Sequence, residues 1–63
     1  MRFVLEIDCN NAAFDEDPRL EVMRLLVGVV EKVGDGALSL PLVDTNGNYV
    51  GRAEFRAEAP DAP

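Results

Sequence analysis

The sequence predicts an α+β fold in which one helix packs on one face of a three-stranded antiparallel sheet. Three observations favour it: residues 2–9 alternate between apolar and polar side chains, residues 18–33 repeat apolar residues at helical spacing, and two further alternating runs flank Asn46-Gly47. Each alternating run keeps one polar face, which is typical of antiparallel sheets with one side in water. The element order is therefore β-α-β-β, and we expect the spatial strand order 1-3-2.

The first strand is predicted from the alternation of residues 2–9. Phe3, Leu5, Ile7 and Cys9 share one face, so we expect them to point toward the core, with Cys9 as a small buried residue. The loop that follows has one large apolar side chain, Phe14, which we expect to pack beneath the helix.

A helix is predicted between Asp17 and Gly34. Asp17 can accept hydrogen bonds from the free amides at the start, and Pro18 suits the first helical position because its missing donor would be unpaired there anyway. Gly34 suits a left-handed residue that ends the helix. The acidic run Asp15, Glu16 and Asp17 complements the helix dipole. The same run could also form an acidic docking patch for a partner.

The predicted helix has more apolar surface than one small sheet can cover. At 100° per residue, its polar residues occupy roughly 100° of the circumference and its apolar residues about 220°. Four residues are expected to face the sheet: Met23, Leu26, Val30 and Val33. Val22, Leu25 and Val29 then form an exposed flank, whose burial would contribute on the order of 5–8 kcal/mol. We interpret this flank as the contact of a two-fold homodimer; the alternative is that Phe14 and the strand edges cover it within one chain.

The second and third strands are predicted to form a hairpin closed by Asn46-Gly47 in a two-residue type I′ turn. This turn places Leu42 opposite Gly51 and puts the core candidates on one face, whereas a slip of one residue would mix the faces. Three residues of the third strand are expected to point inward: Tyr49, Ala53 and Phe55. Pro41 has no amide hydrogen, so the second strand is expected at an edge of the sheet.

The hairpin loop also has a spacing that is typical of a calcium site. Asp44, Asn46 and Asn48 alternate around a glycine, but an EF-hand loop counted from Asp44 would need Gly and Glu where this chain has Tyr49 and Phe55. We therefore interpret the segment as a turn and expect no bound metal or cofactor.

Length and composition limit how the chain can be stabilised. Residues 1–56 are predicted to form one domain, and the Ala- and Pro-rich residues 57–63 a disordered tail. The chain has 63 residues, one cysteine and no histidine, so its core is small, an internal disulfide is excluded and the commonest metal ligand is missing. Self-association is the remaining route by which small domains gain stability.

Several functional classes are disfavoured. The net charge of −6 and the pI of about 4.3 argue against nucleic-acid binding. The longest apolar run is too short to span a bilayer, so we expect a cytoplasmic protein. Without an imidazole, and with little room for the cleft that paired carboxylates need, we expect no enzyme activity. On the outer sheet face Arg2, Arg52 and Arg56 lie among acidic residues, which predicts solvated ion pairs. A ligand or nucleic-acid surface there is the lesser alternative.

Two segments carry a resemblance to known proteins. LEIDCNNAAF (residues 5–14) and LVDTNGNYVG (residues 42–51), with one helix between them, resemble small uncharacterised proteins of bacteriophages, prophages and high-GC bacteria. The resemblance covers nearly the whole chain, implies no catalytic residues and implies an accessory protein in the host cytoplasm. The predicted function is thus a homodimeric accessory factor that binds a protein, such as a host protein. The alternative is a purely structural self-assembly module.

Overall fold

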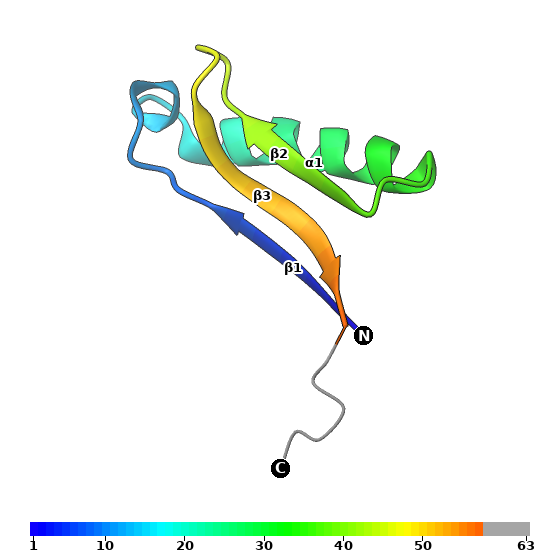
Figure 1. Ribbon diagram of the computed structural model, residues 1–63. Helices are drawn as coiled ribbons and strands as arrows, with labels where there is room; N and C mark the ends of the chain where they lie inside the picture. Colours follow the sequence, from blue (N-terminus) through cyan, green and yellow to red (C-terminus); the bar gives the residue numbers. More distant parts are fainter. Residues whose placement is uncertain (58–63) are drawn as a thin grey trace.

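The computed structural model describes residues 1–57 and contains one long helix and a three-stranded antiparallel sheet (Figure 1). In chain order the elements are β1 (Arg2–Ile7), a short 3-10 helix η1 (Ala12–Phe14), α1 (Pro18–Gly34), β2 (Ser39–Val43) and β3 (Tyr49–Arg56). β3 lies between β1 and β2, which confirms the α+β class and the strand order 1-3-2. Pro41 is therefore in an edge strand, as predicted. Of the predicted disordered tail, residues 58–63 lie outside the described residues.

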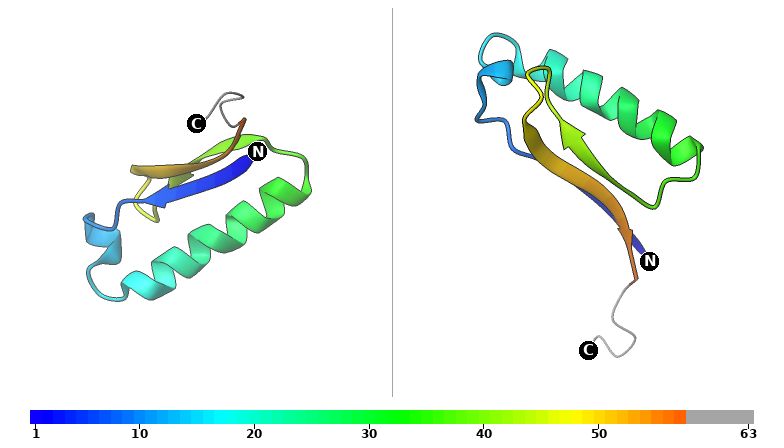
Figure 2. Two further views of the ribbon diagram at one scale, coloured as in Figure 1. Left: turned by 90° about the horizontal axis from the view of Figure 1, so that it is seen from below. Right: turned by 45° about the horizontal axis from the view of Figure 1, so that its top comes forward.

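Helix α1 covers only part of one face of the sheet (Figures 1 and 2). It crosses the strands obliquely and makes its main contacts with β2 and η1. The start of β1 and the end of β3 project beyond the helix (Figure 1). The sheet therefore has a covered part, which forms the core, and an open end.

The core between α1 and the sheet is small. It contains six buried apolar residues: Phe14, Leu25, Val29, Leu42, Val50 and Ala53. Phe14 comes from η1 and is almost fully buried, as the sequence predicted. A core of this size is expected to be marginal for a chain of 63 residues.

The rotation of α1 about its own axis differs from the prediction. Leu25 and Val29 are buried and Val22 is partly buried against the core, so the predicted subunit contact faces the chain's own sheet. Of the four residues expected to face the sheet, only Val33 packs against the core. The other three are exposed: Met23, Leu26 and Val30.

Polar contacts between α1 and the hairpin explain this rotation. Glu21, which belongs to the predicted solvent face, is 7% exposed, and its carboxylate accepts hydrogen bonds from the amide (2.9 Å) and Oγ1 (2.8 Å) of Thr45. Arg24 donates to the same carboxylate from Nε (3.2 Å) and Nη2 (2.6 Å), and to the Val43 carbonyl (3.2 Å). Because a buried carboxylate without partners would be costly, these bonds keep the Glu21 side of the helix against the hairpin.

The ends of α1 lie where the sequence places them. The helix begins after Asp17, whose Oδ1 accepts a hydrogen bond from the Leu20 amide (3.2 Å), and it ends at Gly34. The left-handed residue is two positions later, however, at Gly36, which has a φ of 101°.

The register of β2 with β3 is the predicted one, with Leu42 opposite Gly51. An irregularity between Leu42 and Val43 then places Val43 opposite Tyr49, so that Val50 is an extra residue on β3. This bulge reverses which of the two side chains points toward the core. Val50 is buried, whereas Tyr49, predicted to point inward, is 61% exposed.

The loop of the hairpin differs from the predicted two-residue turn. Asn46 has a negative φ, and Gly47 is the loop residue with a positive φ (85°). The Asp44 amide donates to the Asn48 carbonyl (2.9 Å), and the Gly47 amide donates to the Asp44 carbonyl (3.0 Å). These bonds define a three-residue loop that ends in a left-handed glycine. The extra loop residue and the bulge offset each other, which is why the register beyond them is as predicted.

Candidate interaction surface

The side of α1 that faces away from the sheet carries a continuous apolar surface. Leu20, Met23, Val27 and Val30 follow one another at spacings of three, four and three residues and therefore lie in line along the helix. Each is 58–71% exposed, and Leu26, at 39%, borders them. These five residues, called the outer face of α1 below, span roughly 120° of the helix circumference at 100° per residue.

A surface of this kind is unusual on a helix that already buries its opposite side. Contiguous exposed apolar residues mark contact sites more often than isolated ones do. Arg24 lies on the flank that contacts the hairpin, so no charge interrupts the line from Leu20 to Val30. Each of these side chains would contribute about 1.5–3 kcal/mol if it became fully buried.

A second apolar surface lies at the open end of the sheet. Phe3 and Phe55 are opposite each other in β1 and β3, and their ring centroids are 4.8 Å apart with planes inclined at 59°. They are 41% and 37% exposed. Leu38, whose carbonyl accepts a hydrogen bond from the Phe55 amide (2.9 Å), is 74% exposed. Phe3, Leu38 and Phe55, called the sheet end below, have the alternation of core residues, but α1 does not reach them.

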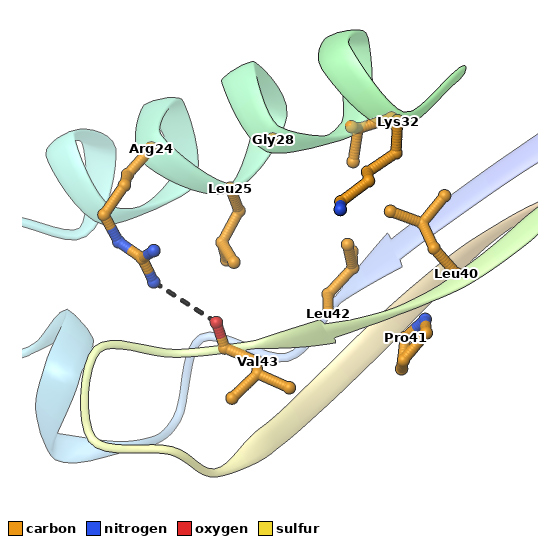
Figure 3. A pocket seen from close by; sticks show the side chains of 9 residues that line it. Arg24, Leu25, Gly28, Lys32, Leu40, Pro41, Leu42 and Val43 are labelled. Atoms are coloured by element: carbon orange, nitrogen blue, oxygen red, sulfur yellow. Dashed lines mark hydrogen bonds between the residues drawn. The ribbon is translucent and has the colours of Figure 1, made fainter. Parts of the chain in front are cut away.

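A shallow hollow of about 180 Å³ lies between α1 and β2 (Figure 3). Apolar side chains such as Leu25 and Leu42 line it, and Arg24 and Lys32 contribute its charged groups. Arg24 is already bonded to Glu21 and to the Val43 carbonyl across one end. Pro41 offers no amide hydrogen to an added strand, so these features fit a protected sheet edge better than a ligand site.

Asp44 organises the hairpin loop. It is buried, its Oδ1 accepts hydrogen bonds from the amides of Asn46 and Asn48 (2.9 Å each), and its Oδ2 accepts one from the Asn11 side chain (3.1 Å). Burial raises the pKa of Asp44, but the hydrogen bonds from Asn48, Asn11 and Asn46 outweigh it and lower the pKa overall. The alternating Asp and Asn residues therefore serve the loop geometry. Among residues 1–57, no group of three His, Cys, Asp or Glu side chains is placed to hold a metal ion.

Glu21 should make the stability of the fold sensitive to acid. The hydrogen bonds from Arg24, together with those from Thr45, lower the pKa of Glu21 from 4.5 to about 2 although burial raises it. A lowered pKa in the folded state contributes stability above pH 4.5, and that contribution is lost as the pH falls toward 2.

We therefore expect the melting temperature to fall between pH 5 and pH 2. In thermal unfolding across this pH range, the melting temperature of Glu21→Gln should be lower than that of the unchanged protein at pH 5 and should fall less toward pH 2. Glu31→Gln, which changes an exposed glutamate of the same helix, should retain the full acid dependence. If Glu21→Gln showed the same dependence as the unchanged protein, this account of Glu21 would be wrong.

The other predicted surface residues do not belong to the two apolar surfaces. Asp15, Glu16 and Asp17 are exposed at the start of α1, and of the three Asp17 also caps the helix. Cys9 is exposed rather than buried, because β1 ends at Ile7 and the alternation does not continue past it.

The face of the sheet opposite α1 carries two ion pairs within β3, whereas the prediction placed ion pairs across neighbouring strands. Glu54 lies 3.4 Å from Arg52 and also pairs with Arg56. Hydrogen bonding from Arg56 lowers the pKa of Glu54. This charged face fits contact with water, in contrast to the apolar surfaces on the other side.

Comparison with protein-family models, curated proteins and solved structures finds no significant match. No helix in the described part of the chain combines the length and the apolar character that a membrane span requires.

The sequence predicted an exposed apolar side of α1 but assigned it to the residues that are buried. The missed residues are Glu21 and Thr45, whose hydrogen bonds join positions that are 24 residues apart. No signal at a single position of the sequence indicates them. Gly28, one of the residues of the predicted solvent face, lines the hollow between α1 and β2, but an added Cβ there would meet nothing within 4 Å, so no close approach of the strand requires a glycine at this position.

Proposed function

We propose that this protein is a non-enzymatic, self-associating module that acts through protein–protein contacts, with the outer face of α1 as its contact surface. The observation that supports this proposal is the line of apolar residues from Leu20 to Val30, which remains exposed although the opposite side of the helix is in the core. Sequestering this surface would lower its exposure to water and reduce the aggregation that such patches promote.

The size of the core supports the same proposal. Six buried apolar residues make up the core, and residues 1–57 hold no disulfide that could add stability. Because only the folded chain can bind a second copy, association shifts the folding equilibrium toward the folded state. A dimer is the simplest closed assembly.

Absolute mass in solution tests the proposal. Light scattering on a sizing column is expected to give two chains for the unchanged protein over a range of concentrations, and one chain for Val27→Glu, because the contact would have to bury a carboxylate. Tyr49→Glu is the matched control, since Tyr49 is as exposed as Val27 (61% and 58%) but lies on the hairpin. It should keep the mass of two chains. A monomeric unchanged protein, or a dimeric Val27→Glu variant, would contradict the proposal.

A role as an accessory factor extends this proposal and is supported by the resemblance to phage and prophage proteins. After self-association through α1, the acidic residues Asp15 and Glu16 stay exposed at the start of the helix, where a basic surface of a host protein could bind. A purely structural module would use only the contact with itself.

A further inference from the structure

We propose that in the dimer the outer face of α1 of each copy covers the sheet end of the other copy. This inference rests on the proposed self-association and adds which two surfaces meet. A second copy of this chain would thus cover both apolar surfaces.

The width of the outer face is the first argument. Helix α1 buries one apolar side, formed by Val22, Leu25 and Val29, against its own sheet. Leu20, Met23, Val27 and Val30 alone have the spacing of a seam between two paired helices, and the exposed Leu26 widens the outer face to roughly 120°. An apolar arc wider than about 100° is what a helix presents to a sheet or to a broad core. With Leu26 included, the outer face is therefore wide enough to cover a sheet surface as well as to pair with another helix.

The sheet end is a part of the sheet surface that α1 does not cover. Phe3 and Phe55 continue the alternation of Leu5 and Ala53, which pack in the core, so their rings lie on the side of the sheet that α1 covers elsewhere. The start of β1 and the end of β3 project beyond α1 in both Figure 1 and the right view of Figure 2. A helix from a second copy laid on these rings would complete the helix layer, as two-layer packing requires.

Symmetry gives the third argument. If the outer face of α1 contacts the sheet end of the second copy, a two-fold axis repeats the same contact in the other direction, and both apolar surfaces of both copies are buried in one closed dimer. If instead the outer face bound a second outer face and the sheet end bound a second sheet end, two different contacts would be needed to cover both surfaces. Unless the two contacts shared one two-fold axis, the molecules would join into open chains.

The distribution of charge fits this arrangement. The residues of the outer face and of the sheet end are uncharged, and Arg19 borders the outer face one turn before Met23. The opposite face of the sheet carries the ion pairs of Glu54 with Arg52 and Arg56. The two charged sheet faces would form the outside of the dimer, with both helices between the sheets. The apolar arc of about 220° on α1 is then explained, because a helix between two sheets is buried on two sides.

Leu38→Glu tests the pairing directly. Leu38 is 74% exposed and precedes β2, which begins at Ser39, so the change should cost the folded monomer little. It is expected to reduce the mass from two chains to one, as Val27→Glu does, while circular dichroism and thermal unfolding show a folded chain. Tyr49→Glu should again remain dimeric.

Charge complementation identifies the two surfaces as partners. Val27→Lys and Leu38→Glu are each expected to be monomeric alone and to form a mixed dimer when combined. The mixed dimer has one interface with Lys and Glu on opposite sides and one interface in which both surfaces are unaltered, and it should weaken with added salt.

The outcomes separate this inference from the proposed function. If Leu38→Glu stays dimeric while Val27→Glu is monomeric, the pairing is wrong, but self-association through α1 stands. If both variants are monomeric and do not combine when mixed, the pairing is also wrong. A monomeric unchanged protein would overturn both proposals.

Discussion

Gly51→Ala is expected to unfold the protein. An ideal Cβ at Gly51 would lie 1.9 Å from the carbonyl oxygen and 2.8 Å from the carbonyl carbon of Glu6, which belong to the backbone of β1 and cannot rotate away. β1 would have to separate from β3 beside the bulge. Overpacking costs up to about 3 kcal/mol where side chains can adjust, and a backbone clash should cost more. The total stability of a chain of 63 residues is only about 3–9 kcal/mol at ~0.05–0.15 kcal/mol per residue.

Urea unfolding followed by circular dichroism measures this effect, and Gly28→Ala is the matched control. A Cβ at Gly28 would meet nothing within 4 Å, and alanine is favoured over glycine inside a helix by about 1 kcal/mol. The same substitution should therefore stabilise the protein at Gly28 and abolish the fold at Gly51. A folded Gly51→Ala variant with an unchanged midpoint would show that β1 does not approach β3 this closely.

The second large effect is expected at Leu25. Leu25→Ala removes a side chain from the centre of the core, where it is 6% exposed, and should cost about 2–5 kcal/mol. Leu20→Ala makes the same chemical change on the outer face, where Leu20 is 61% exposed, and should cost the monomer little.

The comparison is best made by urea unfolding in the Val27→Glu background, where the proposed dimer cannot contribute. A larger loss for Leu20→Ala than for Leu25→Ala would contradict the orientation of α1 described above. Without the Val27→Glu change, Leu20→Ala should additionally weaken self-association, and sizing at several concentrations would detect this.

The exposed apolar face of α1 could be predicted only in part. The number of apolar residues on the helix exceeds what one three-stranded sheet covers, and this excess is visible in the sequence. Which residues form the excess depends on the rotation of α1, and hydrophobic periodicity alone does not determine that rotation. The side with Leu25 and Val29 and the side with Met23 and Val30 are equally apolar, so the polar contacts of Glu21 decide between them.

By itself, the sequence determined the features that depend on neighbouring residues. Alternation located the strands, Asp17 and Pro18 located the start of the helix, and the absence of an amide hydrogen in Pro41 predicted an edge strand. These signals are reliable because backbone sterics and hydrogen-bonding capacity act over a few residues. The register of Leu42 with Gly51 was also predictable, since any other pairing would mix apolar and polar faces.

Only the tertiary structure decided the features that depend on distant residues. The buried carboxylate of Glu21 finds a partner in Thr45, and the bulge at Val50 compensates for the longer loop. The oblique crossing of α1 over the sheet leaves Phe3 and Phe55 partly exposed. Each of these depends on how whole elements fit together in space. Short-range preferences do not contain that information, because the energies involved arise only when the helix and the hairpin meet.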